Sequence, residues 1–247
     1  IIVDDPSEMN VIQTWIDGRC VYDGDKTLFT PGEIIKINKF KCTRLLQDEL
    51  RVINEGGKIN VIVAVNGELT TDAEIIRAGE NEFVLPRPEE DLLKIVVKER
   101  YNDKPPAVGF IKGFGLKRGA MASSVAHDSH NIIAVGTNDR DIVTAINLLI
   151  DAGGGMSVAS DDGAEILKLP VAGIMSDLPV TAMASRYEKL SETVKALGSV
   201  LDAPFMTLSF MALLVIPKLK MSDRGLFDGV AFRDRKSTRL NSSHRIR

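Results

Sequence analysis

The stretch NIIAVGTNDRDIVTAINLLIDAGGGMSVASDDGAEILKL, residues 131–169, decides the fold class. It begins with an apolar strand, residues 131–135, after which Thr137 or Asn138 is placed to cap a helix. The helix carries its apolar residues at helical spacing and ends at three glycines. A hairpin around the turn Asp161-Asp162-Gly163 follows. Strands that alternate with helices in this way predict a mixed α/β fold.

The rest of the chain divides into two expected parts. Residues 1–85 have mostly β character, with a hairpin over residues 11–22 and a strong strand at residues 58–65. Residues 86–233 form the expected α/β part. Its other predicted elements are strands at residues 107–111 and 120–125, a helix over residues 88–101, and a long helix from Pro179 to Leu197 that Ser176 or Asp177 would cap.

Residues 234–247 (DRKSTRLNSSHRIR) have no apolar period and turn abruptly basic. One codon choice for residues 234–244 begins GATCGGAAGAGC, the start of a widely used sequencing adapter. We therefore expect an artefactual tail without packed structure and leave it out of the fold argument. The alternative interpretation of such a basic run is a disordered tail that binds nucleic acid.

Composition excludes several classes of protein. The 247 residues are 44% hydrophobic and 26% charged, which excludes a disordered chain, and no apolar run reaches the roughly 18 residues of a membrane span. The tail holds five of the 31 Lys and Arg residues and one of the 34 Asp and Glu residues. The remaining 26 bases and 33 acids predict no nucleic-acid partner, and we also expect no membrane partner. The two cysteines, Cys20 and Cys42, suit a reducing cytoplasm.

The segment Ala122–Asn131, ASSVAHDSHN, is the main candidate site because it joins two expected strands through a polar turn. Histidine moves protons near neutral pH, and a carboxylate can orient an imidazole. We expect His127 and Asp128 to be catalytic, and the expected substrate-binding residues are Ser123, Ser124, His130 and Asn131. Two alternatives remain: a turn with a purely structural role, and a metal site. The metal site is disfavoured because two histidines and an aspartate this close in an extended turn cannot all face one ion.

A phosphate-binding loop is one interpretation of the glycines at positions 109, 113, 115 and 119. Their spacing, however, matches neither the dinucleotide fingerprint nor the Walker loop. Tight turns between strands are the better explanation. Lys112, Lys117 and Arg118 could bind an anion or simply form a solvated basic surface.

Four segments together resemble the C-terminal part of the bacterial adenine deaminases of the amidohydrolase superfamily: KIVVKERY (94–101), GFIKGFGLKRGAMASSVAHDSHN (109–131), LPVAGIMSDLP (169–179) and PFMTLSFMALLVIPKLKMSDRG (204–225). The opening hairpin resembles the strands that follow the catalytic barrel in such enzymes, so residues 1–85 would be a barrel-flanking segment. The resemblance implies hydrolysis of adenine to hypoxanthine and ammonia by a hydroxide that a divalent metal ion (Mn, Fe or Zn) activates.

The resemblance also implies that the metal ligands lie on a (β/α)8 barrel that precedes residue 1 and is missing here. We expect no metal ligand in this chain, no activity of the fragment alone, a cytoplasmic homo-oligomer and adenine as the small-molecule partner. Two other functions stay open. One is a non-catalytic domain that buttresses a barrel or mediates oligomerisation, and the other is a free-standing metal hydrolase built on His127, Asp128 and His130.

Overall fold

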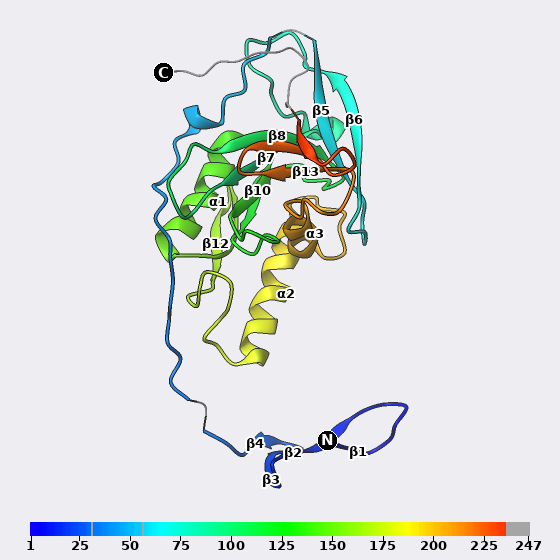
Figure 1. Ribbon diagram of the computed structural model, residues 1–247, viewed down its shortest axis with the longest axis vertical. Coiled ribbons are helices and arrows are strands. Elements are labelled where there is room, and N and C mark those ends of the chain that lie inside the picture. Colours follow the sequence, from blue (N-terminus) through cyan, green and yellow to red (C-terminus); the bar gives the residue numbers. More distant parts are fainter. Residues whose placement is uncertain (31, 56, 236–247) are drawn as a thin grey trace. The chain divides into compact units, whose positions relative to one another are not determined.

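The computed structural model describes residues 1–30, 32–55 and 57–235, which fall into two compact units, Ile1–Ile35 and the chain from Lys36 onward. The first unit is a small antiparallel sheet in the order β1-β2-β3-β4 (Figure 1, blue). Its strands are β1 (Ile2–Val3), β2 (Val11–Ile16), β3 (Arg19–Asp23) and β4 (Lys26–Thr27). The predicted hairpin is confirmed, since Asp17 and Gly18 link β2 to β3 with positive φ angles of 48° and 72°.

The second unit is built on an eight-stranded sheet in the order β12-β11-β9-β10-β7-β8-β5-β6. All its neighbouring strands are antiparallel except β5 and β8. The strands are β5 (Lys58–Ala64), β6 (Thr71–Arg77), β7 (Leu93–Lys98), β8 (Ala107–Lys112), β9 (Ala120–Ser123), β10 (Ile132–Gly136), β11 (Gly155–Ser160) and β12 (Gly163–Lys168). The predicted strands at 58–65, 107–111, 120–125 and 131–135 and the hairpin at 156–169 are thus confirmed.

The helix predicted over residues 88–101 was wrong. Only a short 3-10 helix, η2 (Pro88–Glu90), forms there, and β7 follows it with all six residues buried. A strand buried on both faces has an unbroken apolar pattern, and a short pattern of this kind also fits the apolar stripe of a helix. The β-branched residues Ile95, Val96 and Val97 favour the strand, because β-branched side chains pack well in sheets.

The compact division also differs from the boundary expected at residues 85 and 86. β5 pairs in parallel with β8 through Val61 and Phe110, so residues 58–77 belong to the same sheet as the later strands. Strand pairing between distant segments leaves no signal in local composition. The boundary was expected at residues 85 and 86 because the sequence pattern changes there from mostly β to α/β. The second compact unit instead begins at Lys36.

Helices cover both faces of the central strands (Figure 1). α1 (Asp139–Ala152) packs on one core cluster, which includes Val96 and Ala134 of the sheet. α2 (Val180–Ala196) and α3 (Pro204–Phe210) pack on a second cluster, which includes Ile95 and Val135. Because adjacent residues of a strand point to opposite faces, these two clusters lie on opposite sides of the sheet. Among the described residues, no helix has the length and apolar character needed to cross a bilayer.

The helix ends agree with the sequence at α1 and differ at α2. Asn138 caps α1 by accepting a hydrogen bond from the Asp141 N–H, and Gly153 ends the helix with φ 71°. At α2 the N-cap is Pro179, without a side-chain cap, so the cap expected from Ser176 or Asp177 was wrong. The competing partners explain this: Ser176 Oγ accepts from the Leu178 N–H, and Asp177 pairs with Lys36.

A third, three-stranded sheet contains β13 (Leu219–Ser222), β14 (Gly225–Asp228) and β15 (Arg233–Arg235). β15 corrects the expectation of a wholly unpacked tail, since Asp234 and Arg235 pair with Phe227 and Leu226 of β14. Backbone pairing does not depend on apolar side chains, so composition missed it. The rest of the expected tail, residues 236–247, lies outside the described residues.

Candidate functional site

The candidate turn, residues 124–131, joins two central strands of the large sheet, β9 and β10. Its backbone is closed by a 2.6 Å hydrogen bond from the His130 N–H to the Ala126 carbonyl, and His130 has a positive φ of 51°. β10 pairs antiparallel with β7, and Ile132 lies opposite Lys98. The residues that follow β7 therefore lie beside the turn.

His127 is held by the last turn of α3. Its backbone N–H donates a 3.1 Å hydrogen bond to the Ser209 carbonyl, and its half-buried ring stacks on Phe210 with 5.2 Å between centroids. The His130 ring contacts it edge-on at 5.7 Å. The turn therefore presents two imidazoles side by side, one of them fixed against an aromatic ring.

The surroundings of His130 favour its neutral form. Burial lowers its pKa below the usual 6.5, and the nearby His127 and Arg100 lower it further, while Asp128 acts in the opposite direction. Its buried Nδ1 has no hydrogen-bond partner among the described residues. A neutral imidazole can accept a hydrogen bond or a proton at one nitrogen and donate at the other, so His130 has an unused polar atom.

Arg100 and Tyr101 complete the site, and sequence reasoning missed both. Tyr101 Oη donates to the Ser129 carbonyl at 3.1 Å and accepts from Arg100 Nη2 at 2.9 Å. The buried Arg100 guanidinium lies over the Phe40 and Tyr101 rings, 5.2 and 4.9 Å from their centroids. The signal was present in KERY at residues 98–101, but the expected helix there concealed that these side chains follow a strand next to the turn.

The six residues predicted for the site separate into two groups. His127 is half-buried and Asp128 is exposed, so both can be reached from outside. Ser123 and Ser124 are fully buried, and Ser124 Oγ accepts from the Gly155 N–H at 2.7 Å and donates to the Gly173 carbonyl at 2.5 Å. Because its hydroxyl is bonded to backbone groups in the core, Ser124 holds the start of the turn and is not placed to contact a substrate.

Asn131 also lies inside, only 4% exposed, with its Oδ1 accepting the Arg100 N–H at 3.4 Å. It therefore joins the turn to the segment after β7. The candidates that remain accessible are His127, Asp128 and the partly buried His130.

Replacing Gly173 by alanine tests how tightly Arg100 is held. Gly173 has φ +71°, and a Cβ there would lie 2.2 Å from Arg100 Nη1. We expect the free energy of unfolding to fall by about 2–3 kcal/mol, because an L-residue is disfavoured at this φ and Arg100 must also move.

Gly67→Ala is the matched control for Gly173→Ala. Gly67 has φ +77°, and an added Cβ there meets no atom within 4 Å, so only the backbone cost of about 1 kcal/mol applies. Urea unfolding of both variants gives the comparison. Equal losses in the two would show that the contact with Arg100 is soft.

Comparison with known proteins identifies the family. A model of the adenine deaminase C-terminal domain matches residues 68–233, about two thirds of the chain and the whole candidate turn. The chain belongs to this family. It is 46% identical over 245 residues to an adenine deaminase of Methanosarcina mazei and 48% identical over 241 residues to one of Methanosarcina barkeri. An adenine deaminase of Salinibacter ruber is 45% identical over 235 residues.

Each of these alignments covers 94% of this chain but only 43–44% of the relative. The chain therefore spans less than half the length of the curated relatives it matches. The resemblance to adenine deaminases and the mixed α/β fold expected from the sequence are both confirmed.

The donor atoms of the described residues do not fit a complete metal site. Within residues 1–30, 32–55 and 57–235, no three His, Cys, Asp or Glu side chains form a group that could hold a metal ion. His127 and His130 lie side by side, yet a protein metal site of the hydrolase type uses at least three protein ligands. A metal ion in the complete protein would therefore need ligands from elsewhere.

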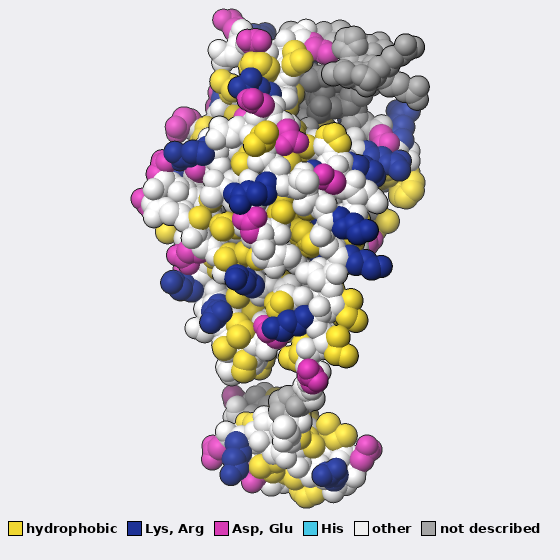
Figure 2. Space-filling view, turned by 90° about the vertical axis from the view of Figure 1, so that its left-hand side faces the viewer, with side chains coloured by type: hydrophobic (Ala, Val, Ile, Leu, Met, Phe, Trp, Pro, Cys, Tyr) yellow, Lys and Arg dark blue, Asp and Glu magenta, His cyan; other side chains and the backbone are white. Residues whose placement is uncertain are grey.

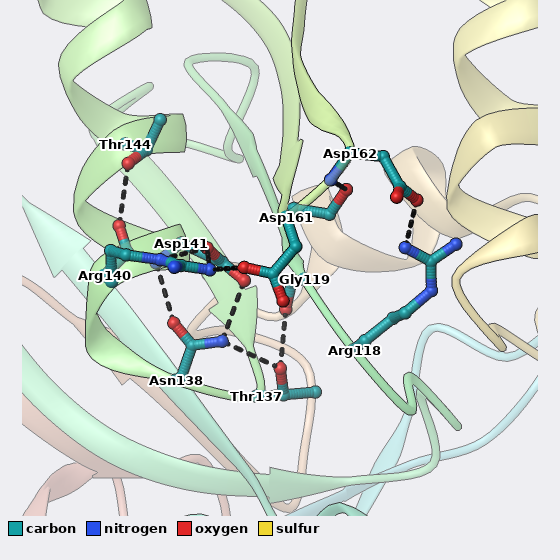
Figure 3. Close-up of polar contacts among 10 residues, drawn as sticks. Arg118, Gly119, Thr137, Asn138, Arg140, Asp141, Thr144, Asp161 and Asp162 are labelled. Atoms are coloured by element: carbon teal, nitrogen blue, oxygen red, sulfur yellow. Dashed lines mark hydrogen bonds and ion pairs between the residues drawn. The ribbon is translucent and has the colours of Figure 1, made fainter.

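A second polar cluster surrounds the first turn of α1 and is drawn in Figure 3. Arg118 pairs with Asp162, and Arg140 pairs with Asp161, so two arginines hold the turn between β11 and β12. Asp141 accepts from Asn138 Nδ2 at 2.8 Å and from Arg140 at 3.0 Å. These arginines are occupied by carboxylates of the same chain, and the cluster is a structural brace.

The lysines of the glycine-rich segment also bond to groups of the same chain. Lys112 pairs with Glu74 at 2.9 Å, and Lys117 donates to the Pro88 carbonyl at 3.3 Å. Gly113, Gly115 and Gly119 all have positive φ, as tight turns require. The turn interpretation is confirmed for these three glycines, whereas Gly109 lies inside β8.

Proposed function

We propose that this chain is the C-terminal part of an adenine deaminase, a hydrolase that converts adenine into hypoxanthine and ammonia. One observation carries the proposal: the family match spans the whole turn of residues 124–131, in which two accessible polar side chains, His127 and Asp128, lie next to the neutral imidazole of His130. Purine recognition requires hydrogen-bond donors and acceptors for the ring nitrogens and the amino group.

The side chains of the turn have distinct proposed roles. His127 moves a proton to or from the purine, because its ring is accessible and fixed by the stack on Phe210. The exposed carboxylate of Asp128 accepts a hydrogen bond from the substrate amino group or orients the imidazole. His130 contacts the base through the exposed part of its ring, since its Nδ1 is buried.

The family mechanism uses a divalent metal ion (manganese, iron or zinc) to activate the attacking water. The described residues offer no such ligand set, and we propose that the metal ligands lie in the part of the protein outside this chain. The chain's own residues would then bind substrate and handle protons at the edge of that centre.

The test is an assay of the complete reading frame on adenine, following hypoxanthine formation by absorbance and ammonia release by a coupled enzyme. Guanine and cytosine are the comparison substrates, since each also carries an exocyclic amine. Turnover of adenine with little or no turnover of the other two supports the proposal. No turnover of adenine by a folded, metal-loaded complete protein would contradict it.

The isolated chain is expected to release no ammonia from adenine, even with added Mn²⁺, Fe²⁺ or Zn²⁺. A metal-activated water needs several protein ligands and an open coordination position, and the turn supplies only two imidazoles. The complete protein, assayed in parallel, is the positive control. Metal-dependent ammonia release by the purified chain would show a self-contained site and favour a free-standing metal hydrolase.

A second function, buttressing or oligomerisation, is favoured by the surface of the first unit. Ile16 and Phe29 are 58% and 57% exposed, and Trp15 is 48% exposed. Exposed apolar groups on a small sheet indicate a contact surface. We propose that the complete protein is a homo-oligomer, which light scattering coupled to size-exclusion chromatography would measure.

The proposed setting is the cytoplasm, where the free thiols of Cys20 and Cys42 stay reduced. On the face of the molecule shown in Figure 2, Lys and Arg side chains are scattered among Asp and Glu side chains. Such mixed charge favours a small-molecule substrate over a nucleic-acid or membrane partner.

A further inference from the structure

Lys220, in β13, is a fully buried cation with no counter-ion among the described residues. Its side chain is 0% exposed, and it forms no ion pair with any described carboxylate. Its Nζ donates hydrogen bonds to two backbone carbonyls, to that of Leu69 at 2.6 Å and to that of Phe210 at 3.1 Å. Burying an ammonium costs free energy unless hydrogen bonds replace those it made with water. The two carbonyls therefore stabilise the buried Lys220 Nζ.

The two carbonyls belong to segments far apart in sequence. Leu69 lies in the turn between β5 and β6, and Phe210 is the last residue of α3. A side-chain pair also joins this turn to the start of α3: Asn66 Nδ2 donates to Asp202 Oδ2 at 2.9 Å, and Asn66 Oδ1 accepts the Asp202 N–H at 3.1 Å. Hydrogen bonds therefore connect the β5–β6 turn to both ends of α3, and at the C-terminal end the connection runs through Lys220.

The C-terminal end of α3 is also what holds His127. The Ser209 carbonyl accepts the His127 N–H, and the Phe210 ring stacks on the imidazole. The geometry points to Lys220 as a positioning residue that fixes the last turn of α3 and, through it, the place of His127 in the candidate site. The positional claim is independent of the reaction, and its catalytic consequence rests on the proposed function.

Lys94 provides a matched comparison within the same unit. It is 1% exposed, and its Nζ donates to the Leu50 carbonyl at 2.8 Å and to Asp139 Oδ1 at 2.5 Å. These partners lie at η1 (Gln47–Leu50) and at the start of α1. Lys94→Met removes an equally buried ammonium but none of the contacts at α3.

The test is amide hydrogen exchange of the 247-residue chain, followed by NMR under native conditions, in Lys220→Met and Lys94→Met. In Lys220→Met we expect the His127 amide to exchange about 10-fold faster relative to the Ala134 amide in the middle of β10. In Lys94→Met this ratio should not rise, because a general loss of stability does not speed exchange at His127 more than in the core. Cross-peaks between the His127 and Phe210 rings should weaken only in Lys220→Met.

An unchanged ratio in Lys220→Met, or an equal rise in both variants, would overturn the proposal and leave Lys220 with a general structural role. If Lys220→Met does not fold, Lys220→Gln replaces it, because a carboxamide can still donate to one of the two carbonyls. The exchange ratio of His127 should then again rise in the Lys220 variant and not in Lys94→Met, but by a smaller factor. A wild-type ratio in the folded Lys220→Gln variant would likewise overturn the proposal.

A kinetic measurement separates this inference from the proposed function. In the complete protein we expect Lys220→Met to lower kcat for adenine about 10-fold with KM nearly unchanged, as a displaced proton-transfer group requires. A faster-exchanging His127 amide with unaltered kcat would keep the positional claim and reject a catalytic role of His127. Unaltered exchange would reject the positional claim whatever the kinetics.

Discussion

Replacing His127 by alanine in the complete protein is expected to lower the turnover number for adenine by about 100-fold, within the range for a residue that moves protons. The accessible imidazole is lost, while the backbone N–H that bonds to the Ser209 carbonyl is retained. The fold should survive, because the ring is only half-buried and loses mainly its stack on Phe210. Steady-state kinetics at several adenine concentrations, with thermal unfolding alongside, provide the measurement.

Asp128→Ala should give a comparable loss if the carboxylate takes part in the proton transfer. If Asp128 and His127 only hold the substrate, KM should rise while the turnover number stays nearly constant. Ser129→Ala is the matched control, since Ser129 is an exposed neighbour whose contact with Tyr101 runs through its backbone carbonyl. Near-normal kinetic constants in both the His127 and Asp128 variants, combined with a lower melting temperature, would leave the turn a structural role only.

The parts of the fold that the sequence predicted correctly are those with strong local signals. α1 has an asparagine cap, apolar residues at helical spacing and a terminal glycine, all within sixteen residues, and it forms as expected. The hairpins at Asp17-Gly18 and at Asp161-Asp162-Gly163 have turn residues suited to positive φ. Each of these elements is determined mainly by its own residues.

β7 was missed because its environment decides its conformation. The apolar pattern of LLKIVVK fits a helix as well as a strand buried on both faces. Its β-branched residues favour the strand only weakly, and pairing with β8 and β10 decides for it. The pairing of β5 with β8 is similarly non-local. The local pattern of a single sequence does not show which distant segments pair, which also explains why the compact units divide elsewhere than at residues 85 and 86.

The candidate site shows the same limit. The turn from Ala122 to Asn131 could be found because its polar residues are contiguous. Phe210, which stacks on His127, comes from a helix much later in the chain, and Arg100 lies two residues after the missed strand. Ser123 and Ser124 were predicted to bind substrate because the sequence does not show that they are buried, or that the Ser124 hydroxyl bonds to backbone groups.

The largest loss of stability is expected from Asp139→Ala, about 3 kcal/mol or more. Asp139 Oδ1 lies 2.5 Å from Lys94 Nζ, and the lysine side chain is 1% exposed against 25% for the aspartate. Removing one partner of such a pair leaves an uncompensated buried charge, whereas removing both costs less. Lys94→Met/Asp139→Ala should therefore be more stable than Asp139→Ala alone, which urea unfolding of the single and double variants would measure.

The pH dependence distinguishes a buried charge from a simple loss of packing. Burial lowers the pKa of Lys94 below 10.5, and the hydrogen bond and charge of Asp139 oppose that shift. Between the lowered pKa and 10.5 the unfolded chain binds more protons than the folded one, so stability rises with pH in this window. Asp139→Ala removes the opposing effects and extends the window to lower pH. Raising the pH from 7 to 10 should thus restore part of the lost stability in Asp139→Ala and none of it in the double variant. Two results would contradict this prediction: a fall in the free energy of unfolding of Asp139→Ala by less than about 1 kcal/mol, or parallel pH profiles in the single and double variants. Either would mean that water reaches the Lys94 ammonium and compensates its charge once Asp139 is removed.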